Sequence, residues 1–172
     1  MTSKSEKFGF ALGKAFKSVI AATKDSPTPP RQANTPAGPA MYRTNIRNVE
    51  TVDGLPREDG WVDMQVQFLV DKKSAGANHV VGRTVLKPGA RHERHRHHNC
   101  DEFFIVIKGR GHIYSELGEE PSVEGDVVYS PRGCWHGFNN TSNEDVVLVW
   151  GWMGAGSIED SGYEVDPASR KA

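Results

Sequence analysis

The chain has 172 residues, the length of one ordinary domain with a tail to spare. Lys plus Arg (21) nearly balance Asp plus Glu (22), which argues against a nucleic-acid-binding protein. No apolar run reaches the roughly 20 residues of a membrane span. Two cysteines are too few for a disulfide framework and indicate a reducing, cytoplasmic location. Five of the seven histidines fall within residues 79–98, which points to a site there.

Residues 1–24 predict an amphipathic helix with a basic side. Their apolar residues recur at three- and four-residue spacing, while lysines take other positions. Three roles compete: packing on the chain's own domain or an oligomer partner, recruitment to a partner or an anionic membrane surface, or a cleaved targeting peptide. Residues 25–40 contain five prolines and are expected to form an extended linker.

Residues 41–165 predict an all-β domain, and residues 166–172 a flexible tail. Val62, Met64, Val66, Phe68 and Val70 alternate with mostly polar residues, which is typical of a strand with one buried face. Further short apolar runs occupy residues 103–107, 126–130 and 146–150, and turn signals separate them. This pattern indicates a β-sandwich or β-barrel.

Two separate stretches of the chain carry the residues of a metal site. His95 and His97 are two residues apart, so on a strand their imidazoles project to the same face. Glu102 opens the next apolar run, and a short turn would bring its carboxylate opposite the histidine pair. His136 adds a third imidazole from a remote strand. Three imidazoles and one carboxylate suit a divalent first-row metal, and an octahedral ion would keep two positions free.

Other residues are candidates for the surroundings of the ion. The parity of the strands predicts an apolar, aromatic lining for a small substrate, made by Phe104, Phe138, Trp150 and Trp152. Arg83 is the expected inward cation, which would pair with an anionic substrate group. His79 and Tyr129 complete the set of candidate substrate-binding residues.

Three more residues near the histidine cluster carry weaker expectations. Cys134 precedes His136 by two residues, so its thiol would point inward if both lay on one strand. The alternative is a small buried side chain. His92 and His98 fit a solvated turn better than a ligand role.

Both stretches closely resemble the two motifs of the cupin family. The first motif, G-x5-H-x-H-x3,4-E-x6-G, is matched by Gly89, His95, His97, Glu102 and Gly109. The second, G-x5-P-x-G-x2-H-x3-N, is matched by Gly125, Pro131, Gly133, His136 and Asn140. The resemblance implies a double-stranded β-helix, a small jelly-roll barrel. It also implies one divalent ion per subunit, held by His95, His97, Glu102 and His136. Fe(II) is favoured, with Mn(II), Ni(II) or Zn(II) as alternatives.

The resemblance implies a metal-dependent enzyme in which the four ligands are the catalytic group. The leading hypothesis is a mononuclear non-haem Fe(II) dioxygenase acting on a small chelating phenol, diketone or hydroxy-ketone. One alternative is a non-redox lyase, isomerase or decarboxylase that uses the ion as a Lewis acid, with Tyr114, Tyr129 or His79 as proton shuttle. Another is a small-molecule sensor without turnover. A homodimer is expected, with Val147 and Val149 as its apolar edge.

Overall fold

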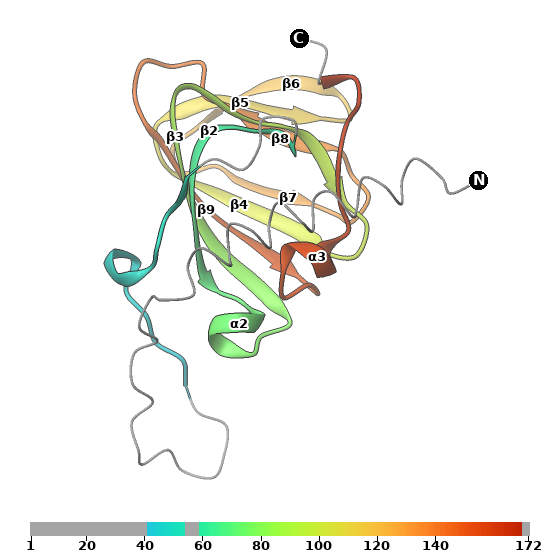
Figure 1. The fold of residues 1–172 in the computed structure, drawn as a ribbon. Coiled ribbons are helices and arrows are strands. Elements are labelled where there is room, and N and C mark those ends of the chain that lie inside the picture. Colours follow the sequence, from blue (N-terminus) through green and yellow to red (C-terminus); the bar gives the residue numbers. More distant parts are fainter. Residues whose placement is uncertain (1–40, 54–58, 170–172) are drawn as a thin grey trace, which may run out of the picture. The chain divides into compact units, whose positions relative to one another are not determined.

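The computed structural model describes residues 41–53 and 59–169 (Figure 1). The predicted helix at 1–24, the predicted linker at 25–40 and the last three residues of the predicted tail lie outside this part of the chain. Two units are distinguished, Met1–Asn45 and Ile46–Ala172. In the first unit, residues 41–45 form neither helix nor strand, and all elements below belong to the second.

The described part of the second unit is built almost entirely from strands. They are β1 (Val52–Asp53), β2 (Trp61–Val70), β3 (His79–His97), β4 (Asp101–Lys108), β5 (Arg110–Ser115), β6 (Gly118–Val123), β7 (Val127–Ser130), β8 (His136–Asn139), β9 (Val146–Met153) and β10 (Tyr163–Val165). Short helices are the 3-10 helix Ile46–Asn48, α2 (Lys72–Ala75) and α3 (Ile158–Ser161). None of these helices is long and apolar enough to cross a membrane. The predicted all-β, double-stranded β-helix fold is confirmed.

Strand β3 organises the sheet. The main order is β6-β5-β8-β3-β9-β4-β7, and all the pairs are antiparallel. Along its 19 residues β3 also pairs with β2 and β10. Figure 1 shows β9, β4 and β7 side by side, with β5, β6 and β8 on the other side of β3. Because β3 contributes to both groups of strands, its inward side chains reach the space between them.

An irregularity in the pairing of β2 with β3 corrects the uninterrupted alternation predicted for residues 62–70. Asp63 has a φ of 54°, a backbone conformation that few non-glycine residues adopt, and the β2–β3 register shifts between Val62 and Met64. Past this irregularity, Trp61 lies on the same inner side as Met64 and Val66. Strand β2 therefore contributes a tryptophan to the interior that strict alternation places outside.

Asn140 connects the end of β8 to the β3 segment around Lys87. Its Nδ2 donates to the carbonyl oxygens of Leu86, Lys87 and Glu144 at 2.9, 3.0 and 2.7 Å. Its Oδ1 accepts from the backbone N–H of Ser142 at 3.0 Å and from the Ser142 hydroxyl at 2.8 Å. The side chain is fully buried, so these bonds replace all contact with water.

We expect Asn140→Asp to destabilise the domain by about 3 kcal/mol, because it replaces the buried donor with an acceptor that faces three carbonyl oxygens. Urea unfolding of the variant and the wild type measures this change. Asn143→Asp is the matched control, since residue 143 is exposed in the same loop. Equal unfolding midpoints for the two variants would contradict this account of Asn140.

Candidate metal centre

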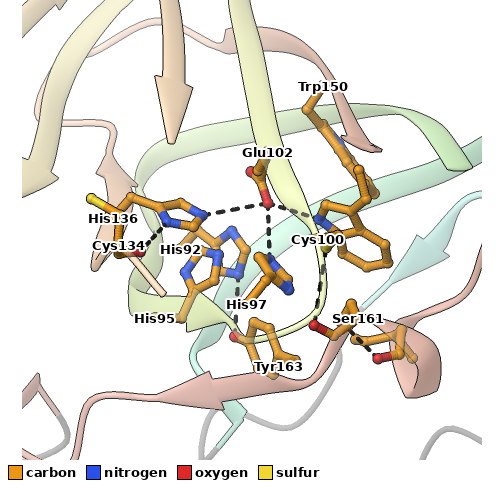
Figure 2. Close-up of polar contacts among 12 residues, drawn as sticks. His92, His95, His97, Cys100, Glu102, Cys134, His136, Trp150, Ser161 and Tyr163 are labelled. Carbon is orange, nitrogen blue, oxygen red and sulfur yellow. Dashed lines mark hydrogen bonds and ion pairs between the residues drawn. The ribbon is translucent and has the colours of Figure 1, made fainter. Parts of the chain in front are cut away.

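Four side chains from three strands converge inside the sheet. His95 and His97 come from the end of β3, Glu102 from the start of β4, and His136 from the first position of β8. All four are buried, and one ligand atom from each lies within 4.8 Å of those of the others. Figure 2 shows the Glu102 carboxylate facing His97 and His136. The turn between β3 and β4 brings the carboxylate to the histidine pair, as the spacing predicts.

Backbone carbonyl groups orient two of the imidazoles. His95 Nδ1 lies 2.7 Å from the Glu93 oxygen, and His136 Nδ1 lies 2.9 Å from the Cys134 oxygen. A carbonyl oxygen can only accept, so each Nδ1 carries a proton and donates it. In the neutral ring, Nε2 then keeps its lone pair, as in metal-binding histidines whose other nitrogen bonds a carbonyl. Both Nε2 atoms are buried; His95 Nε2 has no hydrogen-bond partner among the described residues, and His136 Nε2 faces the Glu102 carboxylate.

The Glu102 carboxylate is the anion at the centre of the group. Its Oε2 lies 2.9 Å from His97 Nε2 and 3.4 Å from His136 Nε2, and it accepts a 2.7 Å hydrogen bond from Trp152 Nε1. Burial opposes its ionisation, but His136 and His97 hold the Glu102 pKa well below its usual value. Glu102 is therefore ionised at neutral pH.

The three imidazoles respond differently to the same burial. Desolvation lowers the pKa of His95 and of His97, so both rings are neutral and can act as ligands. Burial also works against protonation of His136, but the adjacent Glu102 carboxylate raises its pKa above the usual value. Glu102 thus favours the protonated form of His136 over that of the other two imidazoles.

These residues fit a divalent metal ion. Buried nitrogen atoms without partners are costly unless something fills the position between them. Here His95 Nε2 has no partner among the described residues, and the Nε2 atoms of His97 and His136 face only the Glu102 carboxylate. A cation between them would accept these lone pairs and balance the Glu102 charge. Three imidazoles with one carboxylate are a donor set for first-row transition metals.

A cavity opens onto this group. The candidates Phe104, Phe138, Trp150 and Trp152 all lie in its wall, together with Trp61, Met64, Val66, Thr84, Leu86, His92, His95, Glu102, His136, Gly137 and Leu148. Gly82 makes room for one wall residue, because a Cβ there would lie 2.2 Å from the Trp150 ring. The cavity is thus mostly aromatic and aliphatic around one polar end.

The structure corrects three of the predicted cavity positions. Arg83 lies outside, because its neighbour Thr84 faces the cavity, and its guanidinium donates to Gln67 Oε1 at 3.0 Å. Tyr129 is exposed and donates to Asp101 Oδ2 at 3.0 Å. His79, at the first position of β3, is exposed beside Asn78. The cavity wall therefore contains no Arg or Lys among the described residues.

His92 is the residue that sequence reasoning missed. Instead of lying on a solvated turn, it lines the cavity and stacks on His95, with ring centroids 3.8 Å apart. Burial lowers the His92 pKa to about 3, so the ring is neutral. The β3–β8 register shifts between His92 and His95, and this shift puts both rings on one side. Strict two-residue alternation counted back from His95 would instead place the His92 ring on the outer face of β3.

The cysteines and His98 lie outside the cavity wall. Strand β8 begins at His136, so Cys134 is not on it, and its thiol lies on the side of His136 away from Glu102 (Figure 2). The condition for an inward Cys134 thiol, a strand shared with His136, is therefore not met. Cys100 is fully buried, and burial raises its thiol pKa to about 12. His98 is exposed and pairs with Glu164 at 2.6 Å, as a surface residue does.

His136→Ala is expected to lower the affinity for a divalent ion by at least about 100-fold and to leave a folded domain, because only one of four ligands is lost. Elemental analysis after dialysis and circular dichroism measure the two effects. His98→Ala is the control, since it removes an exposed imidazole from the same histidine-rich segment. Wild-type metal content in His136→Ala would refute the ligand set.

Metal affinity should rise with pH through the raised pKa of His136. Below that pKa the ring is protonated and has no lone pair for an ion, so binding must release the proton. Calorimetric titration with Zn(II) at several pH values measures both the affinity and the number of protons released. An affinity that is constant between about pH 5 and pH 8 would contradict this role.

Comparison with known proteins agrees with this geometry. Residues 82–152 match the family described as Cupin domain. Gentisate 1,2-dioxygenase from a Ralstonia species is 29% identical over 107 residues, which cover 57% of this chain and 30% of that enzyme. An uncharacterized protein from Aquifex aeolicus is 39% identical over 55 residues, or 32% of this chain and 46% of that protein. The chain thus spans less than half the length of these curated relatives.

Solved structures give the same assignment of the fold. A cupin-2 domain protein from Rhodospirillum rubrum superposes with a TM-score of 0.60 at 17% identity, covering 79% of this chain and 88% of that one. A sugar phosphate isomerase of the cupin superfamily from Silicibacter pomeroyi superposes with a TM-score of 0.52 at 27% identity, covering 65% of this chain and 76% of that one. Residues 82–152 are thus similar to the Cupin domain family, and the described domain shares the fold of the solved cupin structures, with its motif residues gathered around one buried site.

Proposed function

We propose that this chain is an Fe(II)-dependent dioxygenase that acts on a small chelating phenol, diketone or hydroxy-ketone. The observation that carries the proposal is the buried group of three imidazoles and one carboxylate at the end of an apolar cavity. The similarity to gentisate 1,2-dioxygenase supports oxygen chemistry, although it extends over only 30% of that enzyme. Substrate and reaction are thus proposals for this domain.

The residues of the site have distinct roles in this proposal. His95, His97, Glu102 and His136 hold the ion, and Trp152 fixes the Glu102 carboxylate through its 2.7 Å hydrogen bond. Fe(II) held there would supply the redox chemistry for a reaction between O2 and a chelating substrate. The walls formed by Phe104, Phe138, Trp150 and Trp152 contact the substrate body and exclude water from the reacting atoms.

A non-redox lyase, isomerase or decarboxylase is the second candidate, and His92 is the observation that favours it. Neither Tyr129 nor His79 lines the cavity, and Tyr114 is likewise outside its wall. His92 does line it and is neutral, so it could accept a proton from a substrate. In this case Mn(II), Ni(II) or Zn(II) would replace iron and act as a Lewis acid.

A homodimer and a cytoplasmic location complete the proposal. The outer face of the β9-β4-β7 layer carries half-buried Val147 and Val149, with Ile107 48% and Val127 69% exposed. A second copy covering this face would remove an apolar patch from water. Both cysteines are free, which suits a reducing compartment.

Oxygen uptake separates the candidate reactions. We expect the protein purified without an affinity tag to contain iron and to consume O2 when a catechol or a diketone is added anaerobically and air is then admitted. His98→Ala should consume O2 at the wild-type rate, whereas His136→Ala should lose at least about 100-fold. Turnover without O2, carried by Mn, Ni or Zn, would establish the second candidate instead. Tight ligand binding without product would indicate a sensor.

A further inference from the structure

The hydrogen bonds around His92 define which of its ring nitrogens is free. Tyr163 donates its hydroxyl proton to the Asp59 carbonyl oxygen at 2.8 Å. The Trp61 indole N–H donates to the same Tyr163 oxygen at 3.2 Å. His92 Nε2 lies 3.2 Å from that oxygen, whose only proton is already used, so Nε2 must be the donor. The neutral ring therefore keeps a lone pair on Nδ1.

His92 Nδ1 forms no hydrogen bond with any residue in the described part of the chain, although the ring lines the cavity. Stacking on His95 and the bond to Tyr163 hold the ring in place. His92 lines the cavity beside the group that can hold a metal ion, so Nδ1 is the acceptor that this ring can offer to a ligand. A ligand hydroxyl is the natural donor for it.

The other residues of the cavity wall provide few groups that could bind an anionic group of a ligand. Among the described lining residues there is no Lys or Arg. Each of the three indole N–H groups already donates inside the protein: Trp61 to Tyr163, Trp150 to Thr84 at 2.9 Å, and Trp152 to Glu102. The Glu102 carboxylate leaves a divalent ion with one net positive charge, enough for one ionised ligand oxygen. A second anionic group would be buried without a partner, which is costly.

We propose that the cavity selects an aromatic chelating ligand that bears a hydroxyl group donating to His92 Nδ1 and that has no carboxylate or phosphate group. The aromatic wall around Phe104, Phe138 and Trp150 contacts the ring of such a ligand. The inference deepens the proposed function and rests on its metal centre. It narrows the substrate class to uncharged phenols and makes His92 a residue that determines specificity.

Calorimetric titration under nitrogen tests the charge argument, on protein holding the divalent ion it retains on purification. The probes are catechol and 2,3-dihydroxybenzoate, which differ by one carboxylate. We expect catechol to bind at least about tenfold more tightly. Equal or tighter binding of the carboxylated probe, or no binding of either, would overturn the inference.

A second titration isolates His92. Guaiacol carries a methyl ether in place of one catechol hydroxyl, so the ratio of the two affinities reports chelation together with the hydroxyl contact, and its change on substitution of His92 isolates the contact. His92→Phe keeps a ring on His95 but removes the acceptor, and should reduce this ratio about tenfold. His92→Asn places an amide oxygen near the position of Nδ1 and should retain most of the ratio. A ratio unchanged in His92→Phe would refute the contact.

The metal content of each variant is measured in the same samples, because none of the four ligands is altered. Catechol selectivity without oxygen uptake would refute the dioxygenase and leave this inference standing. Oxygen uptake with a preference for 2,3-dihydroxybenzoate would refute this inference and leave the dioxygenase proposal standing.

Discussion

Ionised Glu102, buried among three imidazoles, is the constraint on which the site depends. A carboxylate removed from water is tolerated only with close compensation, and here His97, His136 and the Trp152 indole supply it. Each partner comes from a different strand, β3, β8 and β9, while the carboxylate sits on β4. The electrostatics of one side chain therefore require the correct pairing of four strands, so the fold and the site specify one another.

Much of the fold and the four candidate ligands could be predicted from the sequence, because both follow from local rules. Strand periodicity identified the runs in β4, β7 and β9. The two-residue spacing of His95 and His97 on one strand placed both imidazoles on one face. The position of His136 was harder, because its strand is remote along the chain. The fixed spacing of the second cupin motif supplied that connection.

The errors occur where the two-residue period of a strand is interrupted or its phase is unknown. The irregular β2–β3 pairing near Asp63 and the extra β3 residue between His92 and His95 interrupt the alternation, so Trp61 and His92 turn inward against the count. Arg83 was predicted on the inner face of β3 and lies on the outer face. A strand with apolar residues on both faces does not reveal which face is the interior. Bulges depend on tertiary pairing, and no local pattern in this sequence marks them.

The short strand β10 has a consequence for how the molecule is made. Its residues Tyr163–Val165 pair with the β3 segment His95–His97, and Tyr163 contacts Trp61, 102 positions earlier in the chain. Such distant contacts form late in folding, because a long loop must close before they gain any stabilisation. During translation, ribosomes must therefore release almost the whole domain before the histidine pocket is complete. A nascent chain stopped short of β10 would expose these imidazoles to whatever cations the cell contains.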